Sequence, residues 1–465
     1  MKPLLNLLEK LEGASKKNKY LHTTYDAFAT FLFQPKETTA LKGGVHVRDG
    51  MDLKRTMVHV VIAMQLALIH GFINIGHQHY VALGLYPDLF DGFLLKAAYG
   101  LLQLLPLIIV VHVVGLGIEF VFAAVKGHAV EEGFLVSGML IPLIMPPATP
   151  LWIVAVSTAF AVVVAKEAFG GTGMNLLNIA LTARVFVFFA YPTEISGDIV
   201  WVSYDYNWLH QLVGMKQHTI ETLTAMYGSL DLASLPSYVP EPVKKAIAEG
   251  GLNVASIADG AKGFKALVVD GYSGATPLAL AAKGGWEAVQ AAKLPDGTQQ
   301  YSVSNLVWGI MPGSIGEMNK VFVVLGAVFL AATRIASWRI MVSMVLGCAA
   351  MGILFNMLAI GIAADTKVSI DTMFIGVPWQ YHFAMGSFFF AMAFMATDPV
   401  TASATNTGKL IYGFMIGALG MVIRVLNPAY PEGWMLAILF MNVFAPLIDH
   451  IVLSFNMKKR LSRAV

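Results

Sequence analysis

Charged residues are scarce in this sequence. Only 13% of its 465 residues are Asp, Glu, Lys or Arg, and 57% are hydrophobic, whereas ordinary soluble domains carry about 25% charged residues. Apolar runs of about 18 to 25 residues recur along the chain, each long enough to cross a ~30 Å hydrocarbon core. A soluble protein has no interior that could bury so many helices that are apolar on every side. The composition therefore predicts a polytopic helical membrane protein.

Cysteine is almost absent. The single residue, Cys348, lies inside an apolar run. One thiol cannot form an intrachain disulfide or hold a four-cysteine iron–sulfur cluster. No cluster of residues has metal-ligand spacing, and a formal net charge of +2 gives no reason to expect nucleic acid as a partner. If this chain carries electrons, it must do so with an organic cofactor.

The distribution of positive charge predicts the topology. Lysines and arginines gather before the first apolar run and after the last one, so the positive-inside rule places both termini in the cytoplasm. No cleavable signal peptide is expected. Five apolar segments precede residues 198–304, near 56–76, 98–125, 134–146, 150–165 and 176–191. Five follow them, near 317–333, 340–364, 376–396, 410–426 and 433–455. Counting outward from a cytoplasmic N-terminus places 198–304 in the periplasm. The expected parts are an N-terminal segment (1–55), two five-span sets (56–197 and 305–455), this insertion, and a basic tail (456–465).

The two five-span sets resemble each other. Pro147 and Pro399 each follow an apolar segment, and Asn175 and Asn427 each come 28 residues later. The span count puts Pro147 outside and Pro399 inside, so the repeat is predicted to be inverted. Inverted halves with segments broken by Gly and Pro indicate a pathway near the midplane of the membrane. Chance similarity between apolar segments is the alternative.

Thr276 stands at the predicted start of a helix in the insertion, in Asp270-Gly-Tyr-Ser-Gly-Ala-Thr-Pro277. Threonine is favoured as an N-cap and proline as the first helical residue. A plain helix cap explains the pattern. A phosphate esterified to this threonine would also face free backbone N–H groups and the positive end of the helix dipole. The same geometry would hold a phosphoflavin.

Several ionisable residues fall within or at the ends of the predicted spans. A charge in hydrocarbon is costly, so it normally faces a partner or a wet cavity. Glu119 and Asp449 are the better candidates for a cation path because hard cations prefer oxygen ligands. Structural ion pairing between spans is the alternative for each of them, as it is for Arg184, Arg424 and His450.

The glycine-rich stretch Gly170-Gly-Thr-Gly173 follows a membrane helix rather than a strand. It is therefore not a nucleotide-binding fingerprint, and we expect it to allow close backbone approach in a broken helix. No NADH site is visible, so a hydride donor must bind to another subunit.

Ordered stretches along nearly the whole chain resemble the B subunit of the Na⁺-translocating NADH:quinone oxidoreductase family. Ser-Gly-Ala-Thr alone is a weak signal, but the full series is specific. The matching stretches begin at His46-Val-Arg-Asp and Asp52-Leu-Lys-Arg and continue through Val164-Ala-Lys-Glu-Ala-Phe-Gly-Gly-Thr-Gly, Ser273-Gly-Ala-Thr, Pro312-Gly-Ser-Ile-Gly-Glu, Met395-Ala-Thr-Asp-Pro and Asn427-Pro-Ala-Tyr-Pro-Glu-Gly.

The resemblance implies an all-α, ten-span fold of the urea-transporter type, with two inverted five-helix repeats. It implies FMN joined to Thr276 by a phosphoester, a non-covalent riboflavin, a ubiquinone acceptor and transported Na⁺. The residues that it implies are Thr276, Ser273, Gly274, Asp270, Asn175 and Gly173 for flavin, Gly115 and Leu116 for quinone, and Glu119, Asp449 and Asp398 for the ion path.

The resemblance also implies partners: a six-subunit assembly in the bacterial inner membrane, with a second flavinylated subunit and an NADH-oxidising subunit. Three features depart from the family pattern. Leu116 replaces the second glycine of the quinone-site pair, Met174 stands where arginine is common, and residues 203–265 form a longer connection than usual.

Two other classes stay open. The D subunit of an Rnf-type ferredoxin:NAD⁺ complex would share the flavinylated threonine and the fold, although the N-terminal His46 and Asp52 stretches and the chain length favour the quinone reductase. A passive channel of the urea or ammonium type would bind no flavin, and it would leave the insertion and its threonine cap without a purpose.

Overall fold

The computed structural model is built of helices. It describes Tyr25 and residues 53–82, 87–126, 133–195, 200–203, 274–294, 297–427 and 432–464. Within these ranges there is no strand, only one isolated bridge between Lys293 and Gln299. Six helices are long and apolar enough to cross a membrane: Thr56–Ala82, Phe93–Lys126, Leu151–Phe169, Trp338–Thr366, Asn406–Leu426 and Trp434–Arg463. The prediction of an all-helical membrane protein is confirmed.

The first group of helices comes from the N-terminal half of the chain. Helix α3 packs against α4, α4 packs against α5 and α6, and α6 packs against α7. Helix α6 runs on into a π-helical turn and a short 3₁₀ turn. The bounds are α3 Leu53–Ala82, α4 Phe93–Lys126, α5 Phe134–Ile144, α6 Leu151–Ala161, η1 Val162–Lys166, η2 Glu167–Phe169 and α7 Ile179–Ala190.

The second group repeats part of this packing order: α16 packs against α19, and α19 packs against α20. The bounds of its helices are α13 Pro277–Ala291, α14 Val303–Trp308, α15 Lys320–Ala332, α16 Trp338–Thr366, α17 Tyr381–Ala384, α18 Phe388–Phe390, α19 Asn406–Leu426 and α20 Trp434–Ala464. Its short turns are η5 Ile370–Thr372, η6 Phe374–Gly376 and the π-helical η7 Ala391–Met395. The turn η3 Pro192–Glu194 follows α7 and belongs to the first group.

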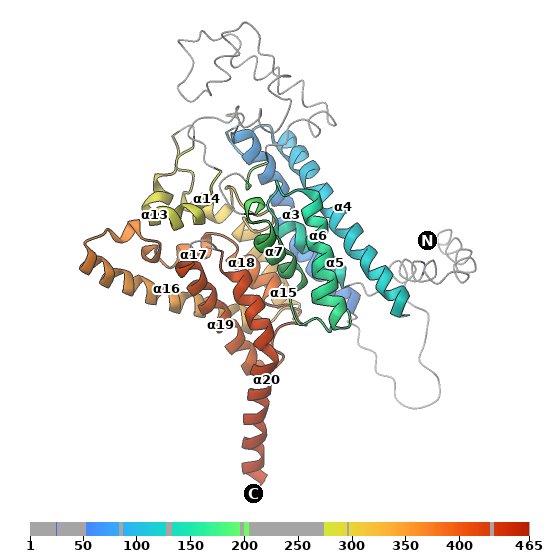
Figure 1. Cartoon of the computed structure of the whole chain (residues 1–465). Helices are drawn as coiled ribbons and strands as arrows, with labels where there is room; N and C mark the ends of the chain where they lie inside the picture. The colour runs from blue at the N-terminus through green and yellow to red at the C-terminus, as the bar shows by residue number, and fades with distance from the viewer. Residues whose placement is uncertain are drawn as a thin grey trace, which may run out of the picture.

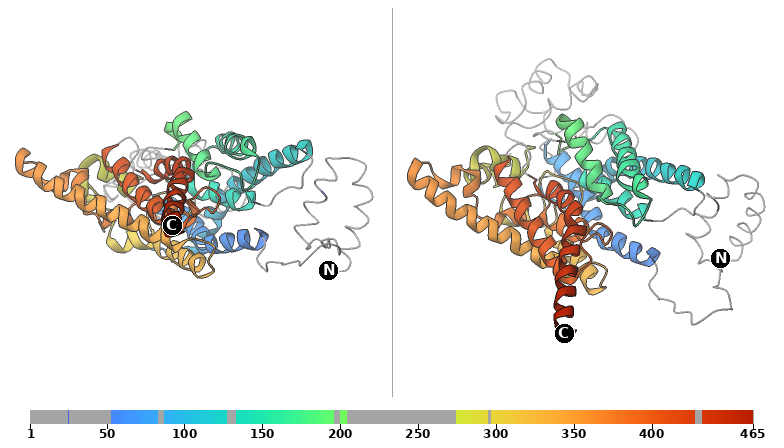
Figure 2. Two further views of the ribbon diagram at one scale, coloured as in Figure 1. Left: turned by 90° about the horizontal axis from the view of Figure 1, so that it is seen from below. Right: turned by 60° about the horizontal axis from the view of Figure 1, so that its bottom comes forward.

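The two groups lie side by side. Helices α4 and α16 extend away from the centre in opposite directions, and α20 runs past the rest of the molecule to the C-terminus (Figures 1 and 2). Helix α15 packs against α3, and α20 packs against α7, so the groups share one interface. Side chains from both groups belong to a single hydrophobic core cluster.

Small residues let the helices approach closely, as is common in membranes. A Cβ atom at Gly347 on α16 would lie 2.1 Å from the carbonyl oxygen of Phe414 on α19, and one at Gly417 would lie 2.1 Å from that of Met344. Neither position could carry a side chain without moving the partner helix.

The predicted spans match helices in most places. The exception is the expected span 376–396, which is not one helix but a succession of short helices, including α17, α18 and η7. Three further apolar helices, α5, α7 and α15, have 10 to 17 residues and fall short of the length of a full span. The ten-span inverted repeat therefore stays a prediction.

Candidate functional site

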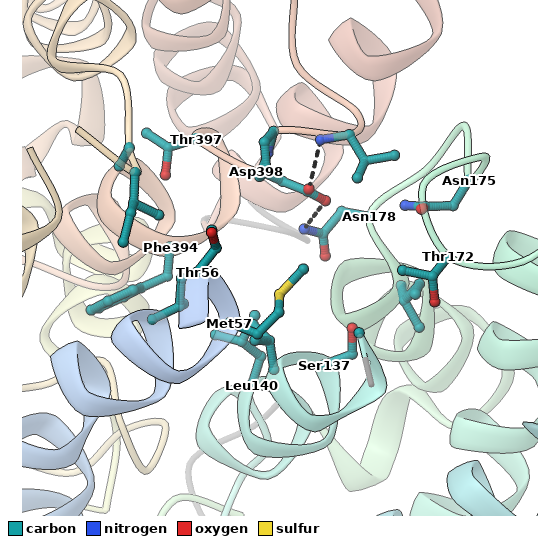
Figure 3. A pocket seen from close by; sticks show the side chains of 18 of the residues that line it. Thr56, Met57, Ser137, Leu140, Thr172, Asn175, Asn178, Phe394, Thr397 and Asp398 are labelled. Carbon is teal, nitrogen blue, oxygen red and sulfur yellow. Dashed lines mark hydrogen bonds between the residues drawn. The ribbon is translucent and has the colours of Figure 1, made fainter. Parts of the chain in front are cut away.

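A cavity lies between the two helix groups at the end predicted to face the cytoplasm. Its enclosed space is about 90 Å³, enough for several water molecules. Its wall combines apolar side chains with several hydroxyl and amide groups. The lining residues that Figure 3 labels are Thr56, Met57, Ser137, Leu140, Thr172, Asn175, Asn178, Phe394, Thr397 and Asp398.

Asp398 and Asn178 meet across this cavity, one from each half of the chain. The Asn178 amide Nδ2 donates to Asp398 Oδ2 at 3.3 Å, and the Val400 N–H donates to Oδ1 at 3.1 Å (Figure 3). Asn178 is also the N-cap of α7, where its Oδ1 accepts from Leu181 N at 3.1 Å. Burial raises the pKa of Asp398, in the connection before α19, against the hydrogen bonds that lower it.

The glycine-rich stretch forms a non-helical turn that carries one side of the cavity. Gly170, Gly171 and Gly173 all have positive φ, at 119°, 105° and 86°, which side chains other than glycine rarely tolerate. The turn places Thr172 and Asn175 on the cavity wall (Figure 3). Thr172 Oγ1 is buried, with no hydrogen-bond partner among the described residues. Such an orphaned hydroxyl fits a wall that contacts a ligand.

Glu119 is paired rather than open to solvent. Its Oε1 accepts a hydrogen bond and ion pair from Lys166 Nζ, and the two side chains are only 4% and 2% exposed. A second ion pair joins the same two segments: Lys126 Nζ lies 3.1 Å from Glu167 Oε2, with 35% of the lysine side chain exposed. Lys166 also lines the cavity. The predicted ion-path carboxylate thus sits directly behind the cavity wall.

The predicted quinone positions have different surroundings. Gly115 is buried on α4, and a Cβ atom there would lie 1.9 Å from the ring of Phe134. Leu116 is half-buried and packs against the edge of the core. Gly115 therefore has a packing role of its own, and neither residue lines the cavity.

Asp449 lies apart from the cavity and anchors the start of α19. Its carboxylate accepts from Ser403 Oγ at 2.7 Å, Ala404 N at 2.7 Å and Thr405 N at 2.9 Å. A carboxylate that accepts several hydrogen bonds at a helix N-terminus is strongly stabilised there. The structure does not bring Asp449 together with Asp398 on the cavity wall.

Thr276 caps α13, as the sequence predicts. Its Oγ1 accepts from Ala279 N at 3.2 Å, and Pro277 is the first helical residue. The side chain is half-buried at the edge of a small pocket of about 10 Å³, room for about one water molecule. Gly274 and Ala275 before it are buried, and the Tyr301 hydroxyl donates to the Ala275 carbonyl. The predicted neighbours Asp270 and Ser273 lie outside the described residues.

Buried cations lie beneath this pocket. Lys320 Nζ donates to the carbonyl of Gly386 at 2.8 Å, and Arg424 NH2 donates to that of Glu432 at 3.3 Å; Gly386 and Glu432 both line the pocket. Arg184 NH1 lies 2.9 Å from Glu317 Oε1. Lys320, Arg424 and Arg184 thus lie close to the carboxylates of Glu317 and Glu432.

One segment connects the two pockets. Gly386 lines the pocket at Thr276, and Ala393 to Val400 line the larger cavity. Gly386 and Phe394 are eight residues apart in sequence, which at a helical rise of ~1.5 Å per residue corresponds to about 12 Å. The short helices of this segment thus lead from one site to the other through the protein.

Comparison with known proteins identifies the family of this chain. The family model of the "NQR2, RnfD, RnfE family" matches residues 40–458. The chain belongs to the NQR2, RnfD, RnfE family. Among curated members, it is 38% identical to the B subunit of the Na⁺-translocating NADH-quinone reductase of Pseudomonas aeruginosa (strain LESB58), with 99% of each chain covered. The proteins of the same name from Chromohalobacter salexigens and Klebsiella pneumoniae (strain 342) are 38% and 37% identical, and at least 96% of each chain is covered.

For this member of the NQR2, RnfD, RnfE family, some of the residues that line the cavity were predicted from the sequence and others were not. Asn175 and Asp398 were predicted, and both line the cavity. Gly173 lies in the turn beside them but has only open space next to its Cα. Asn178 and Lys166 were missed as site residues. Asn178 follows Asn175 by three residues just before a helix, and this N-cap pattern could have signalled it.

Proposed function

We propose that this chain is the membrane subunit of a Na⁺-translocating NADH:quinone reductase in the bacterial inner membrane. It takes electrons from a flavin-bearing partner subunit and delivers them to ubiquinone, with Na⁺ export coupled to the transfer. NADH is oxidised on another subunit of a six-subunit complex. The observation that carries the proposal is the pair of flavin-compatible sites linked by one broken segment, in a chain whose relatives bear this name.

The pocket at Thr276 suits a phosphoflavin on a threonine ester. The helix N-terminus supplies unsatisfied N–H groups next to the threonine oxygen. The side chains of Lys320 and Arg424 lie buried below it and donate hydrogen bonds to residues that line the pocket. The flavin ring would lie outside a pocket of about 10 Å³, toward the partner subunit that supplies electrons.

The larger cavity is the proposed contact for the non-covalent flavin, and its space of about 90 Å³ admits the edge of a ring rather than the whole molecule. Asn175 and Asn178 offer amide donors and acceptors to a ring edge, Thr172 offers an orphaned hydroxyl, and Phe394 offers an aromatic face. Flavins supply one- and two-electron transfer when bound. Here Asn178 would orient the ring and Asp398 would lie close to its charge, next to the path proposed for Na⁺.

A passive channel has less support because it needs neither site. An Rnf-type D subunit would keep both sites, and the family model includes such proteins. The curated relatives named above, which match almost end to end as quinone reductase subunits, favour the quinone reductase.

One experiment separates the two flavins. The complex is purified from a host that holds the flavin-attaching enzyme, denatured, and divided into protein-bound and released flavin. We expect Thr276→Val to lose only the protein-bound fluorescence of this subunit and Asn178→Leu to lose only released riboflavin. Ser302→Ala is the matched control, because Ser302 also caps a helix of the outer region. A Thr276→Val subunit that keeps its fluorescence would contradict the proposal.

A further inference from the structure

The chain is buried on both sides of Thr276. Gly274 and Ala275 before it and Pro277 and Leu278 after it are all buried, whereas Thr276 itself is half-buried. Ala275 and Leu278 expose only 0% and 2% of their surface. The pocket beside the threonine has about 10 Å³ of space, room for about one water molecule. Thr276 is thus the least buried residue of a tightly packed stretch.

Helix α13, which Thr276 caps, packs closely against residues 370–385. The rings of Trp286 on α13 and Tyr381 on α17 stack with their centroids 4.0 Å apart. A Cβ atom at Gly285 would lie 2.2 Å from the carbonyl oxygen of Asp371 in η5. The backbones of α13 and η5 are therefore in direct contact, and the helix cannot shift without losing these contacts.

The residues that close the pocket around Thr276 come from later parts of the chain. Gly386 and Glu432 line the pocket, and the Tyr301 hydroxyl donates to the carbonyl of Ala275. A chain is synthesised from its N-terminus, and segments made early fold before the later ones exist. Thr276 therefore passes through a stage at which these packing partners have not yet been made.

Joining a phosphoflavin to a threonine is a phosphoryl transfer. Thr276 Oγ1 would attack the flavin-side phosphorus of a flavin adenine dinucleotide. The new P–O bond forms as the P–O bond of the anhydride breaks, AMP leaves, and the threonine proton passes to a base of the transferring enzyme. The attacking and leaving oxygens lie roughly in line. The enzyme must therefore hold the threonine and the chain beside it in its own active site.

The packed subunit is a poor acceptor for this reaction. Thr276 Oγ1 already accepts a hydrogen bond from Ala279 N at 3.2 Å, so one of its lone pairs is engaged. The buried residues on both sides leave an enzyme no chain to grip, and a pocket of about 10 Å³ excludes its side chains. The product is less demanding, because an attached flavin needs only a way outward from the half-buried threonine.

We propose that the flavin is joined to Thr276 before α13 packs against residues 370–385, and that the packed subunit is not an acceptor. Attachment thus precedes the last step of folding in this region, and packing then encloses the ester. This inference rests on the proposed function, because it needs Thr276 as the point of attachment.

The first test changes the order of events in the cell. The complex is made in a host whose flavin-attaching enzyme is induced separately, either throughout synthesis or only after synthesis of the complex has been stopped. Protein-bound flavin fluorescence of the subunit is measured in denaturing gels. We expect late induction to give at most about a tenth of the fluorescence obtained with the enzyme present throughout, because only rare local opening exposes the site. Equal fluorescence would overturn the proposal.

The second test uses the intact complex purified without flavin on Thr276, mixed with the attaching enzyme, flavin adenine dinucleotide and Mg²⁺. Gly285→Ala adds a methyl group where α13 meets Asp371. We expect it to raise the rate of attachment about tenfold, because overpacking increases the fraction of molecules in which α13 has come away. Gly297→Ala is the matched control. Both glycines have positive φ, at 67° and 83°, but Gly297 has only open space beside it, so its rate should equal that of wild type.

Tyr301→Phe is a milder variant that keeps the ring and removes the hydroxyl that bonds to Ala275. It should also raise the rate of attachment, and it carries the test if Gly285→Ala does not fold. Wild type reacting as fast as Gly285→Ala and Tyr301→Phe would contradict the proposal.

The outcomes distinguish the two proposals. If the subunit carries no bound flavin even when the enzyme is present throughout synthesis, the covalent flavin of the proposed function fails, and the inferred order fails with it. If Thr276 is modified fully under both induction schemes, the covalent flavin stands and only the order of attachment and packing is wrong.

Discussion

Gly115 and Leu116 are neighbours on α4 and both belong to the predicted quinone site, but their surroundings differ. Gly115 has no room for a side chain, because the Phe134 ring fills the space above it. Leu116, which departs from the family's glycine, is half-buried at the edge of the core. Packing thus determines the first residue, and the second is free to vary with the bound molecule.

We expect Gly115→Ala to destabilise the subunit by about 1–3 kcal/mol, because overpacking forces the Phe134 ring to move. Phe134→Leu should restore much of this loss in the double variant. Leu116→Gly should instead change the apparent KM for ubiquinone, with little effect on the melting temperature. Thermal unfolding of the purified protein, together with quinone kinetics, checks both. A Gly115→Ala protein as stable as wild type would contradict the packing described.

Among the helices, several candidate site residues lie at helix ends. Thr276 starts α13, Asn178 starts α7, and Asp449 holds the start of α19. At each of these starts, free N–H groups are met by a side-chain oxygen, as helix termini require. The same positions are therefore both structural and candidate binding residues.

A substitution at Asp449 tests whether its structural role or its candidate binding role dominates. We expect Asp449→Asn to lower the stability by about 1 kcal/mol, because hydrogen bonds to Ser403, Ala404 and Thr405 weaken. Asp365→Asn, at an exposed position near the end of α16, is the control. Melting curves in NaCl and in choline chloride at equal ionic strength measure the effect. If only the Na⁺ dependence changed and the stability did not, the anchoring role would be wrong.

The sequence predicted elements better than it predicted contacts. Long apolar runs such as 340–364 correspond to single helices because hydrophobicity alone determines that a segment enters the membrane. Hydrophobicity does not show where a helix breaks. The expected span 376–396 is therefore a place where the prediction and the structure differ, because the structure has a succession of short helices there. Thr276 was found because capping is local in sequence. The partners of Glu119 and Asp398, by contrast, lie 47 and 220 residues away, and no local pattern could identify them.

The two candidate sites lie in one helical body and are joined by a single segment of the chain. Residues after 198 and around α13 are predicted outside, and the cavity and both termini inside. The segment from Gly386 to Val400 joins the inner cavity to the outer pocket. The proposed transfer of electrons through one subunit requires this orientation.

Cysteine labelling tests the orientation. The single native thiol, Cys348, is buried, so Cys348→Ala provides a cysteine-free background. Both Lys283 on α13 and Ser462 on α20 are exposed. We expect a membrane-impermeant maleimide to label Lys283→Cys in intact cells and Ser462→Cys only after permeabilisation. The reverse pattern would place the threonine helix in the cytoplasm and contradict the topology.

The most direct test of the account is the mass of the peptide that contains Thr276. The complex is expressed with its flavin-attaching enzyme, purified and digested, and the peptides are weighed and fragmented. The account predicts that this peptide carries the added mass of FMN less one water, located on Thr276. An unmodified Thr276 in fully active complex would contradict it.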